Sequence, residues 1–244
     1  AWLVIRLLRS EDPRWWVPIG AVIGLGMMTR YTMAYWVVGL VAGVLLTGAR
    51  RYLRSRWLWA GVAVSLLVFL PNLVWQLRHD FITLQFLGSI HERDIGEGRT
   101  ANFLVDQFLV AANVFTIPLW LAGLHYLLVA EAGRRYRLLG WMAVTTFLAF
   151  LVSQGRGYDT AGGYPVLLVA GACHAERRLA TLSARWAAAV KVTGGALLAA
   201  GTVMAIVFTL AIHPIGSAGW NAALTLNGDL VEQIGWPDLV ATVA

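Results

Sequence analysis

Apolar runs that recur along the whole chain constrain its fold more than any other feature. They cover roughly 16–28, 31–47, 57–76, 103–129, 138–153, 163–175 and 190–212, and residues 1–8 have the composition of the end of another run. A bilayer core needs about 20 apolar residues in a helix, because lipid leaves no other partner for the backbone. With 59% hydrophobic and 13% charged residues, a soluble or disordered chain is excluded. We therefore expect an all-α fold, a polytopic transmembrane helix bundle of about seven spans.

The charged residues between these runs alternate in character. Segments 6–14, 48–56, 131–137 and 176–191 are rich in arginine, whereas 77–101 is balanced and 213–244 has no basic residue. The positive-inside rule makes the first group cytoplasmic and places the others outside. This alternation requires two short helices within 16–47, split at Thr29-Arg30-Tyr31. The expected location is a bacterial inner membrane, with the outward loops facing the periplasm.

The ends of the chain predict its domain organisation. It opens at Ala1 within an apolar run and ends at Ala244 without a helix-ending signal. We interpret it as an internal piece of a longer protein: residues 1–212 form the helix bundle, truncated at its N-terminus, and residues 213–244 begin an outer soluble domain. The only cysteine, Cys173, cannot form a disulfide within the chain.

Several classes of chemistry have no motif here. The sequence lacks a glycine-rich phosphate loop, a zinc helix, a Cys-x-x-Cys pair and a serine elbow. We expect no metal site and no certain cofactor, although a histidine beside a carboxylate leaves a divalent cation open. The basic residues reflect topology rather than nucleic-acid binding.

Two outward arginines are candidates for binding an anion. Arg30 lies between two short helices, on the side where cations are disfavoured, and its planar guanidinium suits phosphate. A side chain that reaches lipid headgroups is the alternative. Arg156 lies in a glycine-rich segment, 154–165, whose backbone could approach a phosphate or a sugar together with Tyr158 and Tyr164. An ordinary turn in which Asp159 neutralises Arg156 is the alternative.

A third group of candidates lies in the outer segment 71–81. Trp75 could stack on a sugar ring, and His79 and Asp80 could move protons or bind a cation. We interpret the charges within 91–99 as a solvated loop. Polar residues within the apolar runs are few: Asp106, Asn113, His125 and His174. Asp106 lies near the outer edge and His174 near the inner edge, so we interpret both as interfacial.

Three segments resemble a known family in the same order. They are Asp12 to Thr32 with Thr29-Arg30-Tyr31-Thr32, Pro71 to Phe81, and Gly155-Arg156-Gly157-Tyr158 with Tyr164-Pro165. Together they resemble the bacterial glycosyltransferases similar to dolichyl-phosphate-mannose protein mannosyltransferases, which include the lipid A aminoarabinose transferase and have the GT-C fold. The resemblance extends over nearly the whole chain.

The resemblance implies an enzyme that transfers a hexose or pentose from a polyprenyl-phosphate donor to a lipid, glycan or protein acceptor on the outer face of the membrane. Arg30 and Arg156 would bind the donor phosphate, and Tyr31, Trp75, His79, Asp80, Tyr158 and Tyr164 would contact substrate. The family's catalytic acid lies in a first outward loop, which we expect upstream of Ala1, so Asp80 is only a candidate. A transporter or flippase of a lipid-linked sugar is the alternative, but its polar residues should reach the membrane midplane.

Overall fold

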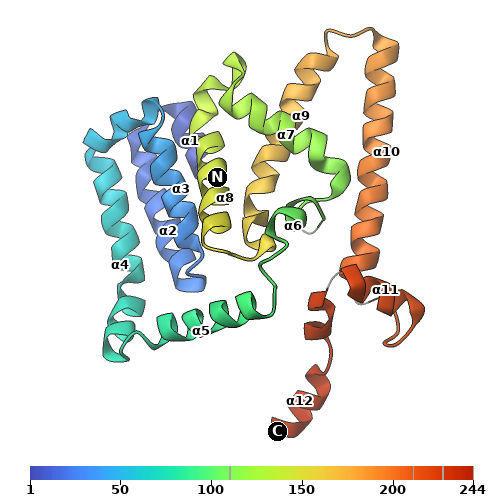
Figure 1. Cartoon of the computed structure of the whole chain (residues 1–244). Helices are drawn as coiled ribbons and strands as arrows, with labels where there is room; N and C mark the ends of the chain where they lie inside the picture. The colour runs from blue at the N-terminus through green and yellow to red at the C-terminus, as the bar shows by residue number, and fades with distance from the viewer. Residues whose placement is uncertain (110, 211, 227, 244) are drawn as a thin grey trace.

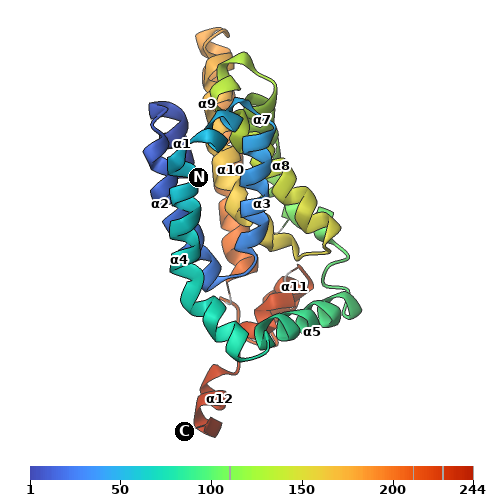
Figure 2. The ribbon, with the colours of Figure 1, turned by 90° about the vertical axis from the view of Figure 1, so that its left-hand side faces the viewer.

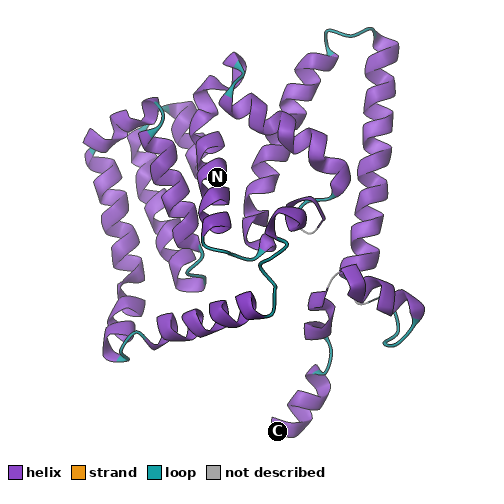
Figure 3. Ribbon diagram, in the orientation of Figure 1, coloured by secondary structure: helices purple, strands orange, loops and turns teal. Residues whose placement is uncertain are grey.

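The computed structural model describes residues 1–109, 111–210, 212–226 and 228–243, and every regular element among them is a helix (Figure 3). The predicted all-α fold is therefore confirmed. The α-helices are α1 (Trp2–Ser10), α2 (Trp16–Thr29), α3 (Met33–Leu45), α4 (Arg56–Arg78), α5 (Ile82–Gly96), α6 (Phe103–Leu109), α7 (Ile117–Leu128), α8 (Arg137–Val152), α9 (Tyr164–Leu179), α10 (Ala184–Thr209), α11 (Ala218–Leu226) and α12 (Trp236–Val243). Short 3-10 helices join them: η1 (Pro13–Trp15), η2 (Gly48–Arg54), η3 (Val114–Thr116), η4 (Glu131–Tyr136), η5 (Gly157–Gly163) and η6 (Gly228–Gln233).

Three helix pairs form the body of the bundle: α2 with α4, α3 with α8, and α7 with α9 (Figures 1 and 2). Glycine lies at each contact. A methyl group on Gly20 would collide with the Gly61 carbonyl, and one on Gly123 would collide with the Leu167 carbonyl. Apolar surface gives little driving force between helices in lipid, so close backbone packing at small residues has to supply it.

Helix length supports a membrane bundle but not a count of spans. Among the described residues, three helices are long and apolar enough to cross a membrane, namely 56–78, 131–152 and 184–209. Helix α3 with η2 makes a fourth if that pair, bent by 102°, is one span. The predicted split of 16–47 is confirmed, because α2 ends at Thr29 and α3 begins at Met33. The count of about seven spans stays a prediction.

Two expectations about the middle of the chain are wrong. The run 103–129 is not one continuous helix: α6 and α7 are separated by η3, where the Asn113 side chain accepts a hydrogen bond from the Phe115 backbone N–H (2.9 Å) and Pro118 starts α7. Segment 77–101 is not an irregular loop, because most of it forms α5, which lies across the end of the bundle (Figures 1 and 2).

The arginine-rich connections and the other connections between helices lie at opposite ends of the bundle. One end, here called the basic end, holds η2, η4 and the turn from α9 to α10. The other end holds the turn from α2 to α3, α5 and η5 (Figure 1). The fold thus segregates the segments as their charge alternation predicts. Beyond residue 213, α11 and η6 bury Trp220, Ala223 and Leu230 in a small separate core, and the domain boundary at 212/213 stays a prediction.

Candidate functional site

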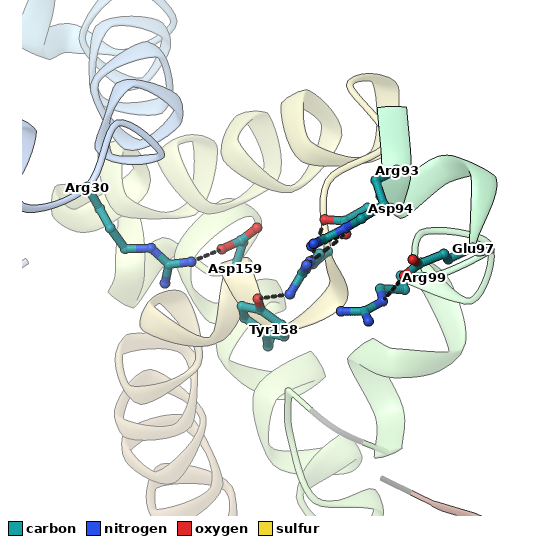
Figure 4. A network of polar contacts seen from close by, with 8 residues as sticks. Arg30, Arg93, Asp94, Glu97, Arg99, Tyr158 and Asp159 are labelled. Carbon is teal, nitrogen blue, oxygen red and sulfur yellow. Dashed lines mark hydrogen bonds and ion pairs between the residues drawn. The ribbon is translucent and has the colours of Figure 1, made fainter. Parts of the chain in front are cut away.

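Arg30 meets Asp159 where α2 ends. Its backbone leaves the helix in an extended conformation (φ −150°), so the side chain points across to η5 (Figure 4). Arg30 Nη2 lies 3.2 Å from Asp159 Oδ1, and the Arg30 side chain is 63% exposed while that of Asp159 is 9% exposed. Burial raises the pKa of Asp159, and the charge of Arg30 opposes that shift. The Arg30 side chain is thus mostly exposed, with its guanidinium carbon 6.0 Å from the centroid of the Tyr158 ring.

Arg156 makes a bidentate pair with Asp94 of α5. Its Nε and Nη2 donate to Asp94 Oδ2 and Oδ1 at 2.7 and 2.8 Å, and its Nη1 donates to the Tyr158 hydroxyl at 2.8 Å. Arg93 adds a contact to Asp94 Oδ1 at 3.3 Å. The hydrogen bonds from Arg156 hold the pKa of Asp94 below its usual value. We call Arg30, Asp94, Arg156, Tyr158 and Asp159 the charged rim.

This pair corrects the interpretation of 91–99 as a solvated loop. Asp94 is 4% exposed, because α5 turns its last turn toward η5 and Arg156 covers the carboxylate. Neighbouring charges do remain at the surface: Arg99 Nε pairs with Glu97 Oε2 at 2.8 Å, and both side chains are more than a third exposed. A sequence of mixed charges cannot distinguish these outcomes, because the partner of Asp94 lies 62 residues away.

A buried amide, Gln107 of α6, holds η5 in place beneath the charged rim. Its Nε2 donates to the Gly157 and Phe103 carbonyls at 3.0 and 2.9 Å, and its Oε1 accepts from the Thr160 hydroxyl at 2.5 Å and the Tyr164 hydroxyl at 3.0 Å. The sequence reasoning missed Gln107. A glutamine inside an apolar run was the signal, because a buried amide needs several partners.

Tyr31 also has partners within the protein. Its hydroxyl donates to Asn72 Oδ1 (2.6 Å) and accepts from Gln76 Nε2 (2.7 Å). Gln76 is 3% exposed, and its Oε1 has no partner among the described residues. These bonds fasten the turn after α2 to the last turns of α4.

Trp75, His79 and Asp80 form a separate exposed group at the end of α4. The Trp75 and His79 rings stack with centroids 4.3 Å apart, and His79 Nδ1 lies 2.7 Å from the Trp75 carbonyl oxygen. Asp80 has a positive φ of 51°, in the turn that leads into α5. Within the described part of the chain, no recorded hydrogen bond, ion pair or ring contact joins these three residues to Arg30 or Arg156.

A largely apolar cavity of about 280 Å³ lies directly against η5. Gln107, Thr160 and Tyr164 contribute to its wall, and the rest of the lining is dominated by aromatic and aliphatic side chains that include Trp36, Phe108, Trp120 and Phe147. The charged rim and this apolar cavity thus share η5, which contributes Asp159 to the rim and Thr160 to the cavity wall. No three metal-binding side chains cluster within the described ranges, and the divalent cation considered above stays untested.

Comparison with known proteins finds one matching family and one similar curated protein. Residues 1–75 match the profile of the dolichyl-phosphate-mannose-protein mannosyltransferase family. The predicted resemblance is confirmed. The lipid A galacturonosyltransferase RgtD of Rhizobium johnstonii is 30% identical over 134 residues, which are 53% of this chain and 28% of that protein. No solved structure matches.

The extent of these matches bears on the site. The family profile includes Arg30, Tyr31 and Trp75 but ends before Asp94 and Arg156, so it covers less of the chain than the motifs suggested. The chain spans little more than a quarter of the length of the curated relative it matches. Both findings are similarities to membrane glycosyltransferases, and the long apolar helices agree with a membrane protein.

Proposed function

We propose that this chain forms the donor-binding part of a membrane glycosyltransferase that takes a sugar from a polyprenyl phosphate on the outer face of the membrane. The observation that carries the proposal is the charged rim set against the apolar cavity at η5. A polyprenyl phosphate has an anionic head and an apolar chain, and these two surfaces suit its two parts.

Arg30 is the residue we assign to the donor phosphate. Its guanidinium has one ion-pair contact, to a single Asp159 oxygen at 3.2 Å, and the side chain is mostly exposed. When the sugar C1–O bond breaks and the acceptor oxygen bonds to C1, the electron pair of the broken bond goes to the phosphate oxygen and the acceptor proton goes to a base. A fixed cation stabilises that growing negative charge more in the transition state than in the ground state.

Arg156 has a different role in this proposal. Three of its guanidinium nitrogens are occupied by Asp94 and Tyr158, so it has less freedom to bind phosphate. We assign it to holding η5 and α5 together, so that Asp159 and Arg30 keep their places. Contact with the donor, which the sequence predicts for Arg156, would require Asp94 to be released.

The acceptor and the sugar are proposed on the relatives alone. A galacturonosyltransferase that acts on lipid A points to a lipid acceptor and to a uronic acid among the donor sugars. Tyr164 lines the cavity and Tyr158 accepts a hydrogen bond from Arg156, so both are candidates for contact with the donor. Trp75 and His79 offer an exposed ring pair for a sugar or an acceptor. The catalytic base stays unassigned, and Asp80 remains a candidate.

The test uses the full protein in sealed vesicles with polyprenyl phosphates that carry a hexose, a pentose or a uronic acid. We expect one donor class to be consumed, with release of polyprenyl phosphate and glycosylation of a lipid acceptor. Movement of the lipid-linked sugar across the bilayer without release of polyprenyl phosphate would contradict the proposal and favour a transporter.

A further inference from the structure

A second cavity lies at the basic end, far from the charged rim. It has a volume of about 750 Å³ and lies between η2 and η4, next to the end of α1. Its lining includes five arginines and one acidic residue: Arg50, Arg51, Arg134, Arg135, Arg137 and Glu11. The arginines come from two segments more than 80 residues apart in the chain, so the fold brings them together.

Few of these cations are neutralised within the protein. Arg51 Nη2 lies 3.2 Å from Glu11 Oε2, and both side chains are more than half exposed. No ion pair is recorded for Arg50, Arg134 or Arg135 in the part of the chain that the structure describes. The Arg137 Nε is buried and has no hydrogen-bond partner among those residues. A buried guanidinium N–H without an acceptor is costly, so it points to an acceptor from outside the chain.

The backbone that presents these arginines is held by internal contacts. The Thr47 side chain accepts from the Ala49 backbone N–H at 3.3 Å at the start of η2, and Tyr52 is buried. In η4, the Tyr126 hydroxyl donates to the Ala132 carbonyl at 3.0 Å, and a methyl group on Gly133 would collide with the Tyr126 carbonyl. The arginines therefore extend from fixed turns.

We propose that this cavity binds the phosphate of an anionic phospholipid headgroup in the adjacent leaflet. Guanidinium groups bind phosphate oxygens in pairs, and basic pockets between membrane helices suit such headgroups. A lipid is favoured over free phosphate because Leu46 and Trp141, both exposed, lie at the same cavity beside α3 and α8 and can contact the glycerol and acyl chains. The site is independent of the proposed transferase activity.

The test measures the melting temperature of the delipidated full protein in detergent as phosphatidylglycerol, phosphatidylcholine or inorganic phosphate is added. We expect only phosphatidylglycerol, of these three ligands, to raise the melting temperature at micromolar concentrations. The double variant Arg134→Gln with Arg135→Gln should weaken the apparent affinity for phosphatidylglycerol by about tenfold or more. The control removes two exposed arginines from the same end but outside the cavity, Arg178→Gln with Arg185→Gln, and should bind as the native protein does.

The comparison between lipids needs only the native protein, so it holds even if the double variant fails to fold. Equal stabilisation by phosphatidylcholine would overturn the proposal. An equal shift from inorganic phosphate in the same concentration range would overturn the lipid assignment. Equal loss of affinity in both double variants would show that the arginines act only as diffuse charge, and would overturn the site.

Discussion

Asp94 and Arg156 fix α5 to η5, and their pair has a testable pH dependence. The pKa of Asp94 is lowered in the folded protein, chiefly by its hydrogen bonds from Arg156. The stabilisation is therefore fully present above the ordinary pKa of 3.8 and is lost as the pH falls through the lowered value. We expect the melting temperature of the native protein to stay constant from neutral pH to about pH 5 and to fall at lower pH.

Replacement of Asp94 by asparagine keeps its shape and removes its charge. We expect Asp94→Asn to lower the free energy of unfolding by about 2 kcal/mol, because charge-assisted hydrogen bonds to Arg156 are lost, and to speed amide hydrogen exchange in α5. The control is Glu97→Gln, which removes a half-exposed carboxylate next to Arg99 and should cost less than about 1 kcal/mol. Equal effects of the two changes would contradict the role of Asp94.

At the scale of elements, the packing of α7 against α9 depends on Gly123. Its Cβ position is filled by the Leu167 carbonyl, so Gly123→Ala must push the helices apart. We expect a marked loss of thermal stability. In α10, Gly194 has nothing within 4 Å of its Cβ position, so Gly194→Ala should be neutral or stabilising by up to about 1 kcal/mol. A harmless Gly123→Ala would show that α7 and α9 do not pack this closely.

The elements also show what the sequence could and could not predict. The break at Thr29-Arg30-Tyr31 was predictable because charge alternation demanded two crossings there. The break before α7 was missed because hydropathy does not register a cap such as Asn113. Helix α5 was missed because its charges resemble those of a loop, although its backbone is regular and its last turn buries Asp94.

The candidate site was predicted in its parts rather than in its connections. Arg30, Arg156 and Tyr158 were singled out from charge, orientation and glycine content, and the structure places them at one end of the bundle. Asp159 was considered only as a partner of Arg156, but its ion pair is with Arg30. Gln107 and the pairing of Asp94 with Arg156 depend on contacts between residues 50 and 62 positions apart in the chain. No local pattern encodes such contacts, so they follow only from the fold.

For the whole molecule, the account requires the charged rim and the basic end to face opposite sides of the membrane. Ala161 in η5 and Ala132 in η4 are both exposed. Serine replaces Cys173 and any cysteine of the full protein outside residues 1–244, which gives a cysteine-free background. In intact cells, a membrane-impermeant maleimide should label Ala161→Cys but not Ala132→Cys, because the basic end is expected in the cytoplasm. Labelling of both, or of Ala132→Cys alone, would contradict this orientation.

The most direct test of the central claim is the affinity of the full protein for polyprenyl phosphate, with neutral polyprenol as the reference ligand. The phosphate lipid is common to every donor of this class, so the sugar need not be known. We predict that Arg30→Gln weakens binding of polyprenyl phosphate by about tenfold or more, through loss of charge-assisted hydrogen bonds, and leaves polyprenol unaffected. Arg78→Gln removes an exposed arginine at the end of α4 and should change neither affinity. Equal binding of polyprenyl phosphate by the native protein and Arg30→Gln would contradict the account.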